Sequence, residues 1–164
     1  MKIAVISDTH NNLSKFKKAA EWMEKQGIKV FIHCGDVQSP STLIEILKIF
    51  KGKVFLCLGN ADYGYEWHKF GHVRVQVFQD VGEVKIDKKN IAFCHFPEQA
   101  KNLAKNKNYD IVFYGHTHKP WEQKINNCCV VNPGNLAGIH YLSTFAIYDT
   151  LDSKLTLKIL KDLD

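Results

Sequence analysis

Two histidines spaced two residues apart, His116 and His118, are the first sign of chemistry in this chain. They follow the apolar run 110–114, which is typical of a buried strand. In extended backbone, side chains at i and i+2 point to the same side. Neutral imidazole is the commonest metal ligand in proteins, so the pair predicts ligands for neighbouring metal ions. Paired histidines also occur in solvated loops. Whether the pair binds metal therefore depends on whether other parts of the chain provide further metal ligands.

Residues of suitable chemistry follow four other apolar runs. They are Asp8 and His10 after residues 2–7, Asp36 after 29–34, Asn60 and Asp62 after 53–58, and His95 after 91–94. In the first half, the runs alternate with helical patterns, which predicts a parallel sheet with right-handed crossovers. Ligands of such sheets gather at the carboxyl ends of the strands. We therefore expect Asp8, His10, Asp36 and Asn60 at one sheet edge.

The helices and strands that must position these residues are predicted from the periodicity of apolar residues and from residues typical of helix ends. Helices are expected at 13–26, capped by Asn12 and stopped by Gly27, at 40–51, capped by Ser39, and from Pro97 onward. From Val73 the pattern changes to short strands, which are expected at 73–78, 81–86, 91–94, 110–114, 121–125, 128–131, 144–148 and 155–160. We expect this second half to be antiparallel.

Composition is typical of one soluble globular domain spanning residues 1–164. Apolar residues make up 45% of the chain and charged residues 24%. No apolar run is long enough to span a bilayer, and a strand is expected directly after Met1, so we expect neither a membrane span nor a secretory signal. The five cysteines lie mostly in apolar runs, which favours reduced, buried thiols in a cytoplasmic protein.

The net charge of +5 does not indicate a nucleic-acid-binding face. Of the 22 basic residues only Arg74 is an arginine, and the lysines are scattered over the whole chain. Duplex-binding proteins concentrate basic residues on one face and use arginine forks. We therefore expect no stable nucleic-acid partner, whereas mild positive charge would attract a small phosphorylated substrate.

The candidate ligands are two carboxylates, one carboxamide and four imidazoles: Asp8, Asp36, Asn60, His10, His95, His116 and His118. That is more than one ion needs, and it suits two ions that share a bridging carboxylate. Two divalent ions roughly 3.5–4 Å apart can clamp a phosphoryl oxygen and bring a bridging hydroxide to attack phosphorus. Nitrogen and oxygen ligands without thiolate favour Mn, Ni, Fe, Co or Zn over Ca or a structural zinc.

The ordered motifs resemble those of the calcineurin-like metallophosphoesterase family, and most closely its small prokaryotic phosphodiesterases. They are Asp8-x-His10, Gly35-Asp36, Gly59-Asn60-x-Asp62, His95 and Gly115-His116-Thr117-His118. The resemblance covers essentially the whole chain and implies an α/β fold, a four-layer α/β/β/α sandwich with two mixed sheets. It also implies a first ion held by Asp8, His10, Asp36 and His118, and a second held by Asp36, Asn60, His95 and His116.

Two positions depart from the family pattern. Many family phosphatases carry a histidine after Gly-Asn, where this chain has Ala61, and close relatives often carry a glycine and a histidine where Phe96 and Pro97 follow His95. The chain therefore lacks an obvious general acid, which typically contributes about 10²–10⁴-fold. We expect weak activity on alkyl monoesters and better activity on diesters with good leaving groups.

Catalysis and substrate contact are assigned to residues that follow the expected strand at 53–58. Asn60 and Asp62 are the candidate catalytic residues, and Asn60, Tyr63 and His68 are candidates for contact with the substrate. The aromatic segment 63–74 is interpreted as a substrate-facing lid, a subunit contact or a short packed helix, and it could stack a base.

Two other classes of protein compete with the phosphodiesterase reading. A non-catalytic scaffold, as in the retromer subunit that resembles these enzymes, would be favoured by missing ligands, and none is missing. A nuclease is disfavoured by the shortage of arginine. Homo-oligomers are compatible with the sequence.

Overall fold

The computed structural model describes residues 1–106 and 108–163, with the side chains of His68 and Asn106 excepted. The α-helices are α1 (Leu13–Lys25), α2 (Pro40–Ile49) and α3 (Pro97–Asn106). The strands are β1 (Lys2–Ile6), β2 (Val30–Cys34), β3 (Lys53–Cys57), β4 (Val75–Phe78), β5 (Val81–Ile86), β6 (Lys89–Cys94), β7 (Ile111–Phe113), β8 (Trp121–Ile125), β9 (Cys128–Asn132), β10 (Thr144–Asp149) and β11 (Lys154–Ile159). Short 3-10 helices follow at Asn60–Asp62, Trp67–Lys69 and Leu160–Asp162.

The first sheet has the strand order β11-β10-β1-β2-β3-β4. Strands β1 to β4 are parallel to one another, and β10 runs antiparallel to β1. The expectation that the chain turns antiparallel from Val73 was wrong at this point, because β4 extends the parallel sheet beside β3. Strand β4 is short and its side chains are partly exposed, so the periodicity of the sequence alone could not assign it to either sheet.

The second sheet has the order β5-β6-β7-β9-β8. Its hairpins β5–β6 and β8–β9 are antiparallel, as expected, whereas β6, β7 and β9 pair in parallel. Helix α3 provides the crossover between β6 and β7, which is the connection that a parallel pair requires. Both sheets are therefore mixed, and the antiparallel prediction for the second half holds for the hairpins β5–β6, β8–β9 and β10–β11 but not for β4, which pairs in parallel with β3, or for the parallel set β6, β7 and β9.

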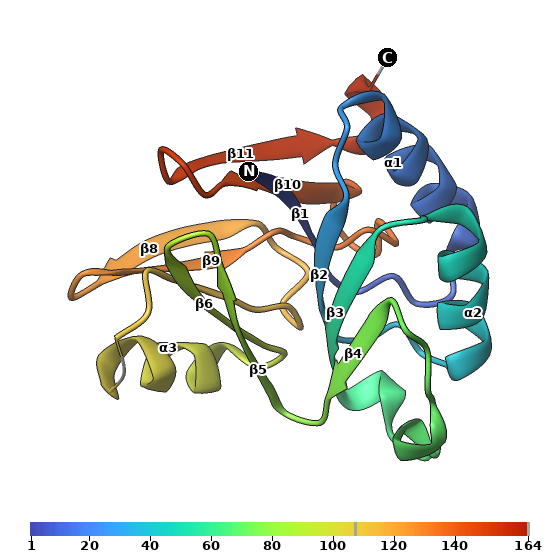
Figure 1. Ribbon diagram of the computed structural model, residues 1–164, viewed down its shortest axis with the longest axis horizontal. Helices are drawn as coiled ribbons and strands as arrows, with labels where there is room; N and C mark the ends of the chain where they lie inside the picture. The colour runs from blue at the N-terminus through green and yellow to red at the C-terminus, as the bar shows by residue number, and fades with distance from the viewer. Residues whose placement is uncertain (107, 164) are drawn as a thin grey trace.

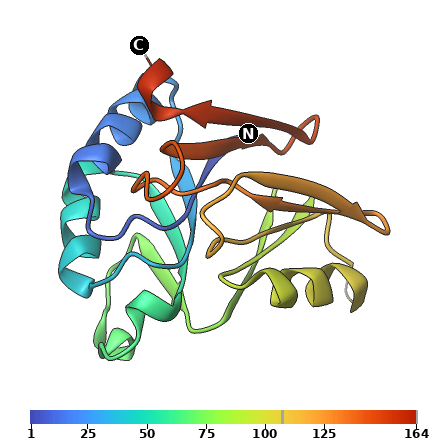
Figure 2. The same cartoon turned by 180° about the vertical axis from the view of Figure 1, so that it is seen from behind.

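The four layers are visible in Figures 1 and 2, with α1 and α2 on one side and α3 on the other. One buried cluster joins the first two helices to the first sheet, a second lies between the sheets, and a third joins α3 to the second sheet. The α/β/β/α sandwich is thereby confirmed.

Local signals set the helix ends that were expected. The Asn12 side chain accepts from the Lys15 N–H at 3.2 Å, and Ser39 Oγ accepts from the Thr42 N–H at 3.2 Å. Gly27 follows α1 with φ +68°, the left-handed conformation typical of a helix stop. These caps fix where each helix begins, and so the path of the loops that precede it.

Candidate metal centre

Loops at the carboxyl ends of strands from both sheets meet at one place. The Asp8 N–H donates to Gly35 O at 3.0 Å, and the His10 N–H donates to Asp36 O at 3.0 Å. From the second sheet, the Gly115 N–H donates to His95 O at 3.1 Å. These backbone bonds hold the loops after β1 and β2 side by side, and likewise those after β6 and β7.

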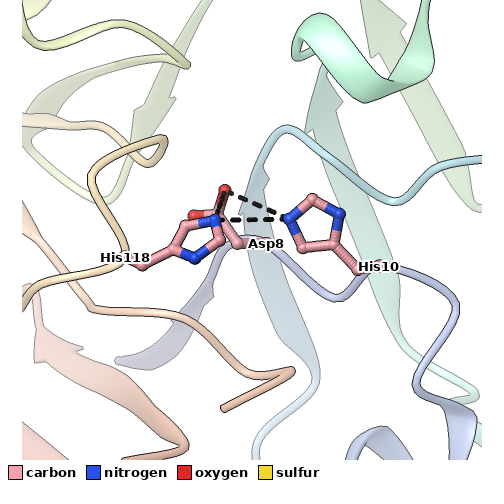
Figure 3. A group of neighbouring side chains, drawn as sticks. All are labelled: Asp8, His10 and His118. Carbon is pink, nitrogen blue, oxygen red and sulfur yellow. Dashed lines mark hydrogen bonds and ion pairs between the residues drawn. The ribbon is translucent and has the colours of Figure 1, made fainter. Parts of the chain in front are cut away.

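A first group of side chains comprises Asp8, His10 and His118 (Figure 3). His118 Nε2 lies 3.3 Å from Asp8 Oδ1 and 3.3 Å from His10 Nε2. Asp8 is fully buried, whereas the two imidazoles are partly exposed. Two ring nitrogens and a carboxylate oxygen thus converge, although residues 10 and 118 are far apart in sequence.

A second group comprises Asp36, His95, Asn60 and His116. His95 Nε2 lies 3.4 Å from Asp36 Oδ2 and 3.1 Å from Asn60 Oδ1. His116 Nδ1 lies 3.0 Å from the same Asn60 oxygen. His95 is fully buried, whereas Asn60 and His116 are exposed. The group is therefore buried at His95 and exposed to solvent at Asn60 and His116, where a substrate would approach.

The Asp36 carboxylate lies between the two groups. Its Oδ2 is 3.4 Å from His95 Nε2 and 3.7 Å from His10 Nε2, so one oxygen faces an imidazole of each group. Asp8, Asp36 and His95 also qualify together as a ligand cluster. The seven side chains that the sequence predicts as ligands therefore form one continuous site.

Five of these seven residues have a left-handed backbone. They are Asp8 (φ 53°), His10 (φ 43°), Asp36 (φ 60°), His116 (φ 68°) and His118 (φ 60°). Only a few per cent of residues other than glycine have positive φ, and such conformations cluster at functional sites. The loops hold these side chains inward at a cost in backbone energy.

The far nitrogens of two histidines are held by backbone groups. His95 Nδ1 lies 2.8 Å from Cys34 O, and the His118 ring donates a hydrogen bond to the backbone at Ile139. A ring whose Nδ1–H donates to a carbonyl presents a bare Nε2 to a metal, and this is the usual outer support of histidine ligands. Such support is typical of histidines that bind a metal.

Two glycines allow the backbone to approach the site closely. A Cβ at Gly59 would overlap Asp36 Oδ1, and a Cβ at Gly115 would overlap Ser7 Oγ and approach Asp8 Oδ2. The site therefore requires residues without side chains at both positions.

Charges in the site shift several pKa values. Burial alone would raise the pKa of Asp36, but the hydrogen bond and charge of His95 hold it below its ordinary value. Burial alone would lower the pKa of His95, and contact with Asp36 raises it instead. The hydrogen bond to Asp8 raises the pKa of His118, whereas burial and the nearby His95 lower the pKa of His116.

The predicted catalytic residue Asp62 is fully buried and bonded to backbone. Its Oδ2 accepts from the N–H groups of Asp36 and Gly59, each at 2.8 Å, and its Oδ1 accepts from the Gln38 N–H at 2.6 Å. Burial raises the pKa of Asp62, and these donors partly counter that effect. Asp62 therefore connects the loops that carry Asp36 and Asn60.

The aromatic segment after Asp62 divides into buried and exposed parts. Trp67 is buried and donates from Nε1 to Asp62 O at 2.8 Å. Tyr63 and Tyr65 are exposed to 60% and 49%. His68, a predicted substrate contact, has a side chain outside the described part of the structure. The segment thus contains a short helix that packs on the domain through Trp67 and an exposed aromatic face formed by Tyr63 and Tyr65.

Sequence reasoning missed three residues around the site. His140 is exposed, and its ring stacks on His118 with 6.4 Å between centroids. Asn135 Nδ2 donates to His118 O at 3.0 Å, and Asn132 Nδ2 donates to Gly115 O at 2.8 Å. The sequence Asn-Pro-Gly-Asn at 132–135 is typical of a tight turn. The two asparagines in that turn were the available signal.

Comparison with known proteins agrees with this geometry. Residues 1–153 match the calcineurin-like phosphoesterase superfamily domain. The chain therefore belongs to the calcineurin-like phosphoesterase superfamily. It is 31% identical over 157 residues to Phosphodiesterase MJ0936 of Methanocaldococcus jannaschii, covering 92% of this chain and 93% of that protein.

Solved structures show the same fold. The structure of a novel archaeal phosphodiesterase superimposes with a TM-score of 0.86 at 28% identity, covering 97% of this chain and 99% of the other. Vacuolar Protein Sorting 29 from Cryptosporidium parvum has a TM-score of 0.68 at 20% identity, covering 96% and 95%. The latter likeness concerns the fold alone. Among the described residues, no helix is long and apolar enough to cross a membrane.

Proposed function

We propose that this chain is a dinuclear metal-dependent phosphodiesterase that acts on a small phosphoester substrate. The observation that carries the proposal is the position of Asp36 Oδ2, which faces His95 at 3.4 Å and His10 at 3.7 Å. Superfamily membership and the phosphodiesterase named among the relatives support the same activity.

The donor set fits two divalent ions. Asp8, His10, Asp36 and His118 would hold one ion, and Asp36, Asn60, His95 and His116 the other. The set offers imidazole nitrogens with carboxylate and amide oxygens and contains no thiolate, which suits Mn, Ni, Fe, Co or Zn. We propose these ions as the cofactors. When bound, such ions supply Lewis acidity, which provides hydroxide as the nucleophile near neutral pH and neutralises charge on the phosphate.

The chain's own residues bind and orient the ester. Asn60 and His116 are exposed at the mouth of the second group, so their polar atoms would contact phosphoryl oxygens. Asp62 contributes by positioning the loops of Asp36 and Asn60 rather than by touching the ester, since both its oxygens accept backbone N–H groups. Tyr63 is the exposed aromatic residue closest in sequence to these loops and remains a proposed substrate contact.

The leaving group would depart without help from a histidine at position 61. Ala61 instead donates its backbone N–H to Asp36 Oδ1 at 2.8 Å. A good leaving group needs no proton as its bond breaks, whereas an alkoxide does. We therefore propose aryl diesters as better substrates than alkyl monoesters.

We further propose the cytoplasm as the location, because all five cysteines are free thiols. A homo-oligomer is compatible with this assignment.

The proposal is tested by removing metal with a chelator and assaying bis-p-nitrophenyl phosphate while Mn, Ni, Zn or Mg is returned singly. Turnover should return with metal and be lost in Asp36→Asn and His95→Ala. A control substitution, Asp80→Asn, removes an exposed carboxylate outside the site and should leave turnover unchanged. Metal binding without cleavage of any ester would favour the scaffold alternative.

A further inference from the structure

A cavity of about 520 Å³ is lined by the loop that carries His118, by α3 and by β8. Its walls include Thr117 and Lys119, the chain neighbours of His118, and Pro97, two residues after His95. Successive Cα atoms are about 3.8 Å apart, so the cavity wall begins one residue from the candidate ligands. The residues that line the cavity and the candidate ligands thus belong to the same loops.

Two exposed aromatic side chains line the same cavity. Trp121, at the start of β8, is exposed to 53%, and Tyr141, in the loop before β10, is exposed to 48%. In Figure 1, β8 lies across from α3, whose first turns provide Pro97 and Lys101 to the wall. Cavities of roughly 300–1,000 Å³ lined by aromatic and a few polar groups are typical sites for small ligands.

The charge of the cavity is weakly positive. Lys101 Nζ is paired with Glu98 Oε1 at 2.6 Å, so these two charges largely cancel. Lys119 is exposed and makes no ion pair within residues 1–106 and 108–163. A cation directly after His118 favours an anionic ester over a neutral one.

We propose that this cavity binds the retained arm of the substrate diester and selects a planar ring of the size of a nucleobase. The inference rests on the proposed function and assigns a substrate class to that site. Stacking on an aromatic side chain depends on the π-face that every base has. The cavity therefore recognises a nucleoside-like arm without selecting one base.

The test compares two esters that differ only in the retained arm. They are the p-nitrophenyl ester of thymidine 5′-monophosphate and methyl p-nitrophenyl phosphate, which share leaving group and charge. The thymidine ester should have the higher kcat/KM, by about tenfold or more, as one stacked base provides. Because the arm is remote from the reacting bond, the difference should lie mainly in KM.

Variants assign the preference to the cavity. Trp121→Ala and Tyr141→Ala should each lower kcat/KM for the thymidine ester while leaving the methyl ester unchanged. Ile44→Ala is the control, because Ile44 is exposed to 46% in α2 and lies outside the cavity. Equal losses on both esters, or no preference in the wild-type protein, would overturn the inference.

A binding measurement separates this inference from the proposed function. Thymidine 5′-monophosphate and inorganic phosphate are titrated into the metal-loaded protein by calorimetry. The nucleotide should bind more tightly, and Trp121→Ala should abolish the advantage. If neither ester is cleaved but this advantage is seen, the proposed function fails and the cavity assignment stands. If the two ligands bind equally, the cavity assignment fails.

Discussion

The carboxylate of Asp62 holds Asp36 by its backbone, with Oδ2 accepting the Asp36 N–H at 2.8 Å. The same oxygen accepts the N–H of Gly59, so the loops after β2 and β3 are joined through one buried side chain. The candidate bridging ligand and the Asn60 loop thus share a common support. A residue that appears catalytic from its motif acts here through the residues it positions.

Replacing Asp62 by Asn tests this positioning role. The amide keeps the shape of the side chain but offers one acceptor oxygen, so at least one buried N–H loses its partner. We expect the metal-free variant to lose about 1–3 kcal/mol of unfolding free energy, measured by urea denaturation. Asp80→Asn, at an exposed position, is the matched control. Turnover in Asp62→Asn should fall, but its dependence on pH should keep the wild-type shape. If the rise or the fall of turnover with pH disappears in the variant, Asp62 transfers a proton.

Position 61 should govern which leaving groups are accepted. With alanine there, bis-p-nitrophenyl phosphate should be cleaved faster than any alkyl phosphomonoester. Ala61→His should raise the alkyl monoester rate by up to about 10²-fold, the lower range for general acids. Ala61→Asn provides the control, since it adds a polar side chain without an imidazole and should give no gain. Faster turnover of an alkyl monoester by the wild-type protein would refute the idea.

His33 should make stability depend on pH in the metal-free protein. It is fully buried in β2 beside Thr9, and burial lowers its pKa to about 3. The unfolded chain takes up this proton near pH 6.5, whereas the folded chain does not. Protonation therefore favours unfolding, and stability falls as pH drops from about 6.5 towards 3.

The size of this effect can be measured by substitution. His33→Gln should remove up to about 1.4 kcal/mol per pH unit from the pH dependence of the unfolding free energy between pH 6.5 and 5.5. Gln76→Ala removes an exposed side chain that does not titrate and should keep the wild-type slope. Parallel pH curves for wild type and His33→Gln would show that His33 is protonated in the folded state.

Much of the site could be predicted because its residues follow strand ends. The loops after β1, β2 and β3 lie together by the topology of a parallel sheet, which the alternation of strands and helices predicts. The meeting of His118 with Asp8 was different, since it depends on how two sheets face each other, and the family resemblance provided it. Strand β4 was misassigned because four half-exposed residues carry no signal of their partner. His140 was missed because its place beside His118 results from a loop path that no local pattern encodes.

The central claim is that two ions share the Asp36 carboxylate, and counting bound metal tests it most directly. The chelated protein is loaded with manganese, freed of excess by gel filtration and analysed for metal per chain. The account predicts two ions in the wild-type protein, one in His10→Ala, one in His95→Ala, and weakened binding of both in Asp36→Asn. A single ion in the wild-type protein, or two retained in Asp36→Asn, would contradict it.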